Sequence, residues 1–271
     1  MLNKRYTLNE KIGEGGLSIV YDVNDIYAQY FNDNKKLIAK IPSKKIIDKK
    51  DISAFVYSEY SLLSALQHEN IVKVIDFGID EESNTPYIIM QKLEGSLLVN
   101  IALHEINSKM KYNIISSLYK AIKYIHQQGI IHADINPTNI MILPDGNTKL
   151  FDFGISLNIN NEDYNFSYTK MNAYNPIYTA PELFENQQPS KKTDIFSLAC
   201  VLYELYTTKL PFRNSSIELL DNPVKLSQLI NIPLLQRIWF KKALSYNPNK
   251  RPDTIPLTIR LKSYFKNCIF W

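Results

Sequence analysis

Cysteine and long apolar runs are scarce in this chain. It has two cysteines among 271 residues, Cys200 in an apolar stretch and Cys268 near the C-terminus, so the sequence predicts neither a disulfide framework nor a zinc site. The longest apolar run, Ile195–Tyr206, is too short to cross a bilayer and is interrupted by Glu204. Residues 1–5 lack the apolar core of a secretion signal. These absences favour a cytoplasmic protein with no membrane partner.

A strong charge of one sign is also lacking, because the net charge is only +4. Nucleic-acid binders concentrate basic residues on one face. The nearest approach to such a cluster is more typical of a solvated loop, and consists of Lys44, Lys45, Lys49 and Lys50. The sequence therefore predicts no nucleic-acid partner. An apolar share of 45% is enough to bury a sizeable core, and 271 residues suit one domain of two lobes or two small domains.

The most informative stretch is residues 132–139, which read HADINPTN, followed by DFG at 152–154. Two short apolar runs flank a Pro-Asp-Gly turn between them and predict a hairpin. Such a hairpin places Asn139, before its first strand, beside Asp152, after its second. An amide oxygen and a carboxylate suit a hard cation such as Mg²⁺, and Asp134 offers a carboxylate that can accept a hydroxyl proton. Asn139 alone would be explained as a loop cap, and Asp152 alone as the end of a strand. The two residues together with Asp134 favour phosphoryl transfer, which uses all three.

At these residues the chain resembles the eukaryotic-type protein kinase family, whose catalytic loop reads H-R-D-x-x-x-x-N and whose metal motif reads D-F-G. The resemblance runs from about Tyr6 to the C-terminus, with the motifs in the family's order. It implies an α+β, bilobal protein-kinase-like fold forming a single domain over 1–271. The small β-rich N-lobe would span about 1–90, the hinge 91–93, and the larger helical C-lobe about 94–271.

In the first half, Leu37–Ile41 resembles the family's V-A-I-K strand and nominates Lys40 for the α/β-phosphates of ATP. Apolar residues recur at helical spacing over Asp51–Gln67, with Glu59 inside the stripe. A carboxylate on a core-facing stripe needs a cationic partner. We therefore expect Glu59 to pair with Lys40, as in the family. The alternative is a lysine on an exposed edge strand.

A glycine-rich turn within Lys11–Tyr21 resembles G-x-G-x-x-G-x-V, with Ser18 in place of the third glycine. Alone it is weak evidence, since most such turns are ordinary hairpins, but glycine lets the backbone approach phosphate closely. The resemblance implies an ATP site that also has apolar residues around the adenine, although any of these is equally a core residue by composition. The expected ATP-binding residues are Ile12, Gly13, Glu14, Gly15, Gly16, Val20, Ala39, Lys40, Met90, Gln91, Leu93, Met141 and Asp152, and the expected Mg²⁺ ligands are Asn139 and Asp152.

In the second half, apolar spacing predicts a helix over Met110–Gln128 that stops at Gly129, and a buried helix over 194–206. The resemblance implies that Asp194 accepts backbone hydrogen bonds from the catalytic loop. It also implies that Glu182, in the A-P-E motif, pairs with Arg251.

Two departures concern the catalytic loop. Ala133 replaces the arginine that binds an activation-segment phosphate in the family, so mutating Ser167, Tyr168 or Thr169 should leave activity largely intact. Asn136 replaces a lysine that contacts the γ-phosphate, and Asn175 replaces a nearby threonine. The two asparagines could hydrogen-bond to each other and to Asp134, but neither supplies a charge. Losing a charged donor commonly costs ~10²–10³ in rate, so we expect modest turnover, and Asn136→Lys should change rate more than ATP affinity.

The leading hypothesis is a Ser/Thr protein kinase that uses ATP and Mg²⁺ to phosphorylate protein substrates and itself, with catalytic residues Asp134, Lys40, Asn139 and Glu59. A nucleotide-binding pseudokinase scaffold is suggested by Ala133 and Asn136. A small-molecule kinase shares the H-x-D-x-x-x-x-N loop, but the A-P-E motif and Arg251 argue against it. The many Asn, Ile and Lys residues favour an AT-rich, bacterial source.

Overall fold

The computed structural model describes residues 1–33, 35–43, 46, 51–160, 175–222, 224, 229–230, 232 and 234–256. The chain divides into two compact units. One takes Met1–Glu94 and Phe153–Ala173, and the other takes Gly95–Asp152 and Tyr174–Trp271. The expected basic cluster at residues 44–50 and Cys268 lie outside the described residues, as do Ser167, Tyr168 and Thr169.

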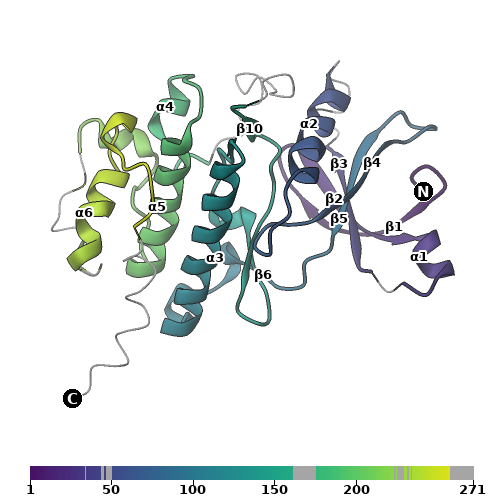
Figure 1. The fold of residues 1–271 in the computed structure, drawn as a ribbon, viewed down its shortest axis with the longest axis horizontal. Coiled ribbons are helices and arrows are strands. Elements are labelled where there is room, and N and C mark those ends of the chain that lie inside the picture. The colour runs from purple at the N-terminus through teal and green to yellow at the C-terminus, as the bar shows by residue number, and fades with distance from the viewer. Residues whose placement is uncertain are drawn as a thin grey trace. The chain divides into compact units, whose positions relative to one another are not determined.

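The first unit is built on a five-stranded antiparallel sheet with the order β1-β2-β3-β5-β4 (Figure 1). Its strands are β1 (Tyr6–Glu14), β2 (Ser18–Asp25), β3 (Leu37–Pro42), β4 (Val74–Ile79) and β5 (Pro86–Gln91). Helix α2 (Ile52–Ser64) contacts β4 and β5. A short helix, α1 (Ile26–Tyr30), links β2 to β3, and β10 (Leu157–Asn158) completes the described elements of this unit.

The second unit combines helices with a three-stranded sheet of order β6-β8-β9. The strands are β6 (Ser96–Leu97), β8 (Ile140–Ile142) and β9 (Thr148–Leu150), and β7 (Ile130–Ile131) lies in the loop after α3. The helices are α3 (Ser108–Gln127), α4 (Pro181–Phe184), α5 (Lys191–Thr207) and α6 (Leu234–Ala243). Helix α5 contacts both α3 and α6 (Figure 1). Its residues are buried on nearly all sides, which confirms the expected buried helix.

Helix boundaries differ from the expected ones where side chains cap the ends. Asn107 accepts a hydrogen bond from the Met110 amide, so α3 begins at Ser108. A capping box of Ser190 and Thr193 starts α5 at Lys191, before the expected residue 194. The predicted stop at Gly129 is confirmed, since its φ of +76° is a left-handed conformation that favours glycine.

No helix within the described part of the chain combines the length and the apolar content that a bilayer span requires.

Candidate active site

The catalytic loop is fixed to helix α5 by Asp194, as expected. This carboxylate is fully buried and accepts the main-chain N–H of His132 at 3.0 Å and of Ala133 at 2.8 Å. His126 of α3 also contacts it, with Nε2 2.8 Å from Oδ2. Ala133 has a φ of +66°, a conformation that is strained for a residue with a Cβ. Asp194 therefore holds the loop in a shape that its own sequence does not favour.

The buried His132 ring contacts the backbone at Asp134 in the catalytic loop and the backbone just before Asp152 in the hairpin. Its Nδ1 accepts the Asp134 N–H at 3.2 Å, which assigns the ring proton to Nε2. Nε2 then donates to the Phe151 carbonyl at 3.3 Å, one residue before Asp152. The histidine of the motif thus has a structural task.

Two neutral amides hold the Asp134 carboxylate. Asn136 Nδ2 donates to Oδ1 at 2.8 Å, and Asn139 Nδ2 donates to Oδ2 at 2.8 Å. Asn139 Nδ2 also donates to the Asp134 carbonyl at 2.9 Å. The expected contact of Asn136 with Asp134 is confirmed. No hydrogen bond joins Asn136 to Asn175 among the described residues, and Asn175 Oδ1 accepts the Ile177 N–H of its own turn at 3.3 Å.

The predicted hairpin forms between β8 and β9, where Ile140 pairs with Leu150. The Asn139 carbonyl accepts the Phe151 N–H at 3.1 Å, so Asp152 lies one residue beyond the direct partner of Asn139. Asp152 has a φ of +63°, which turns the chain sharply after the strand.

The donor set of the hairpin fits a magnesium ion. Because Asn139 Nδ2 donates to Asp134, Oδ1 is the amide atom of Asn139 suited to a cation, and Asp152 adds carboxylate oxygens. Mg²⁺ keeps several waters and needs few protein ligands, so two residues are enough to hold it. Among the described residues no cluster of three or more His, Cys, Asp or Glu side chains is placed to hold a metal.

In the first unit, the predicted ion pair between β3 and α2 is confirmed. Lys40 Nζ lies 2.6 Å from Glu59 Oε1 and 2.8 Å from Oε2, and the two side chains are 13% and 3% exposed. Lys40 sits between Val20 of β2 and Ile88 of β5 in the sheet. The pairing explains how a carboxylate is tolerated on the buried face of α2.

The turn between β1 and β2 carries the glycines expected to face phosphate. Gly15 N–H donates to the Ser18 carbonyl at 2.8 Å, and a Cβ built on Gly16 would meet nothing within 4 Å. Ser43 is an addition that the sequence reasoning missed. Its hydroxyl donates to the Gly16 carbonyl at 3.2 Å and its N–H to the Leu17 carbonyl at 2.9 Å, so it fixes the tip of the turn to the end of β3.

The remaining residues predicted to contact ATP belong to both units. In the first unit, Ala39 and Met90 are buried on the adjacent strands β3 and β5. Gln91 is the last residue of β5 and Leu93 follows it, whereas Ile12 and Glu14 are exposed on β1. Met141 lies in β8 of the second unit and pairs with Lys149. Their contacts with ATP stay predictions.

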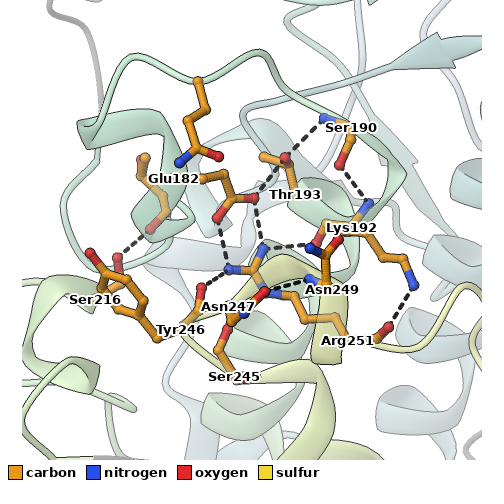
Figure 2. Close-up of polar contacts among 12 residues, drawn as sticks. Glu182, Ser190, Lys192, Thr193, Ser216, Ser245, Tyr246, Asn247, Asn249 and Arg251 are labelled. Atoms are coloured by element: carbon orange, nitrogen blue, oxygen red, sulfur yellow. Dashed lines mark hydrogen bonds and ion pairs between the residues drawn. The ribbon is translucent and has the colours of Figure 1, made fainter.

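The predicted pair of Glu182 and Arg251 is confirmed (Figure 2). Arg251 Nη1 and Nη2 each lie 2.7 Å from a Glu182 carboxylate oxygen, and the side chains are almost fully buried. Thr193 donates to the same carboxylate at 2.9 Å. Arg251 also donates to the carbonyls of Lys192, Ser245 and Tyr246, so one guanidinium joins α4, α5 and the turn at 245–251.

Comparison with known proteins agrees with this geometry. The chain is 30% identical over 265 residues to the serine/threonine-protein kinase PknB of Mycolicibacterium smegmatis. The aligned region covers 93% of this chain and 41% of that protein. It is 31% identical over 217 residues to the serine/threonine-protein kinase PrkC of Bacillus subtilis, covering 79% of this chain and 32% of PrkC. The chain thus spans less than half the length of these relatives. Residues 6–258 match the family described as the protein kinase domain, and the chain belongs to that family.

Proposed function

We propose that this chain is an ATP-dependent protein kinase that transfers the γ-phosphate of ATP to Ser or Thr hydroxyls of protein substrates, itself included. The observation that carries the proposal is the arrangement within the second unit. There, Asp134 is held by amides at both carboxylate oxygens, and Asn139, which supplies one amide, is the residue where the hairpin leading to Asp152 begins. The residues that we propose for proton acceptance and metal binding thus lie on one continuous loop and hairpin.

Each residue has a distinct role in the proposed transfer. Asp134 receives the substrate hydroxyl and accepts its proton. Asn139 and Asp152 hold Mg²⁺, which when bound would neutralise charge on the phosphates. Lys40 binds the α/β-phosphates, and Glu59 fixes the direction of the Lys40 side chain. Gly15 N–H already donates to the Ser18 carbonyl, so we assign the binding of phosphate oxygens to other backbone N–H groups at the tip of the β1–β2 turn.

The names of the relatives support Ser or Thr hydroxyls as the phosphate acceptors. Both PknB and PrkC are named serine/threonine-protein kinases, and the intact Glu182–Arg251 pair supports a protein substrate rather than a small molecule. Because ATP is the donor, we place the domain in the cytoplasm.

The test is transfer of labelled phosphate from ATP by the purified chain, to itself and to a general protein substrate. Asp134→Asn and Asp152→Ala should remove the label. Asp145→Asn, which changes an exposed aspartate of the β8–β9 turn, is the matched control and should keep it. Equal labelling in all variants would identify a contaminating kinase. Nucleotide binding without transfer would favour the scaffold hypothesis suggested by Ala133 and Asn136.

A further inference from the structure

The side-chain amide of Asn136 is oriented by its own loop. Asn136 is 3% exposed, and its Oδ1 accepts both the main-chain N–H of Thr138, at 2.9 Å, and the Thr138 hydroxyl. Because the main-chain N–H of Thr138 can only donate, the amide oxygen of Asn136 must face it and the amide nitrogen must face Asp134. Nδ2 accordingly donates to Asp134 Oδ1 at 2.8 Å and to the Asp134 carbonyl at 3.3 Å.

Asn139, at the other end of the same turn, donates a hydrogen bond to the second carboxylate oxygen of Asp134. Its Nδ2 lies 2.8 Å from Asp134 Oδ2. With one amide on each oxygen, the Asp134 carboxylate cannot rotate about its Cβ–Cγ bond without breaking a charge-assisted hydrogen bond. Residues 132–139 contain no Lys or Arg, so this loop orients its carboxylate with neutral donors of its own.

We propose that Asn136, supported by Thr138, is a positioning residue that fixes the plane of the Asp134 carboxylate for the acceptor hydroxyl. The inference rests on the proposed function, because it concerns the group that receives the substrate. Asn136 lacks the charge of the lysine that it replaces, but under this proposal its amide orients the Asp134 carboxylate.

A purely structural role for Asn136 makes a different prediction. Asn136 also caps the turn at Pro137–Asn139 by accepting the Thr138 N–H. Aspartate caps as well as asparagine and has the same shape, so Asn136→Asp keeps the cap. It replaces the donor facing Asp134 with a second carboxylate. Capping alone therefore predicts that Asn136→Asp resembles the wild type, whereas positioning predicts that it is at least as impaired as Asn136→Ala.

The experiment measures kcat, KM for ATP and melting temperature for Asn136→Asp, Asn136→Ala and Thr138→Val. Asn147→Ala is the matched control, because Asn147 Nδ2 also donates at 2.8 Å to an aspartate two residues earlier, in the exposed β8–β9 turn. We expect kcat to fall roughly 10- to 100-fold in both Asn136 variants, the worth of a charge-assisted hydrogen bond, with KM for ATP within about twofold. Thr138→Val should show a smaller fall, and Asn147→Ala none. A near wild-type kcat in Asn136→Asp would overturn the proposal.

A stability cycle separates this inference from the proposed function. Asp134→Ala, Asn136→Ala and the double variant are unfolded in urea, and the contact predicts that the two changes are not additive. Non-additivity without any phosphate transfer by the wild type would leave the contact intact, refuting the proposed function and the positioning role that depends on it. Transfer together with strict additivity would overturn the positioning role and leave the proposed function standing.

Discussion

At the scale of single residues, the β1–β2 turn contains two glycines with no packing requirement among the described residues. A Cβ on Gly15 would lie 3.9 Å from the Ser18 carbonyl oxygen, and one on Gly16 would lie in open space. Neither residue has a left-handed backbone, so alanine would be unstrained there. The fold does not require glycine at these positions, and glycine there would let phosphate approach the backbone closely, as the proposed function expects.

We therefore expect Gly15→Ala and Gly16→Ala to keep or raise stability, by about 0.4–1 kcal/mol, because alanine restricts the unfolded chain. Both should raise KM for ATP more than they lower kcat. Gly146→Ala is the control. Its φ is +81°, so alanine should destabilise it by ~1–2 kcal/mol without changing KM. Steady-state kinetics and thermal unfolding measure the three variants, and an unchanged KM in the first two would contradict the role assigned to the turn.

At the scale of elements, Asp25 joins β2, α1 and Arg5. Its carboxylate caps α1 through the Tyr27 amide at 3.0 Å and lies 2.8 Å from Arg5 Nη2. Burial alone would raise its pKa, but the hydrogen bonds from Arg5 and Tyr27 outweigh this and hold the pKa of the Asp25 carboxyl below its usual value. Arg5 also reaches Asp76 of β4, at 3.2 Å.

The depressed pKa predicts how stability depends on pH. Asp25 stabilises the fold fully above the ordinary carboxyl pKa of 3.8, and this contribution is lost as pH falls through its lower folded value. A side-chain amide at this position cannot titrate, so Asp25→Asn should lower the melting temperature at neutral pH and make its decline in acid shallower. Melting curves at several pH values measure this. Parallel declines in the two proteins would show that Asp25 is not responsible.

A second element-level prediction concerns the start of β6. A Cβ on Gly95 would lie 2.1 Å from the Ile142 carbonyl oxygen, in the pairing of β6 with β8. Gly95→Ala should therefore lower the free energy of unfolding by ~1–3 kcal/mol, since backbone must move. Gly13→Ala, whose Cβ would lie 3.8 Å from that of Val20, is the matched control for stability. Equal urea midpoints for the two variants would exclude the clash.

The sequence predicted those parts of the fold and site whose signals are local or repeated. Apolar periodicity located α2 and α3, and a buried carboxylate on that stripe pointed to Lys40. Helix α1 was not predicted, because its five residues are too short for periodicity and depend on Asp25 as a cap. The contact of Ser43 with Gly16 joins residues 27 apart and has no sequence signal. The orientation of Asn136 follows only from the positions of the Thr138 donors.

At the scale of the whole chain, the Glu182–Arg251 pair connects residues 69 apart. Arg251→Met should lower stability by ~3–5 kcal/mol, because it leaves a buried carboxylate uncompensated and several carbonyls without their donor. Glu182→Gln should cost less, since its amide oxygen still accepts from Arg251 and Thr193. The double variant should lose less than the sum of the two changes. Urea unfolding of the three proteins measures this, and simple additivity would argue against a direct pair.

The 69 positions that separate Glu182 from Arg251 also separate the times at which the two residues are synthesised. At about 5–20 residues per second, a ribosome that has just added Glu182 needs roughly 3 to 14 s to reach Arg251, 69 positions later. During that interval Arg251, the partner of the buried Glu182 carboxylate, has not yet been made. The buried pair at the A-P-E motif therefore cannot form until residue 251 has been added.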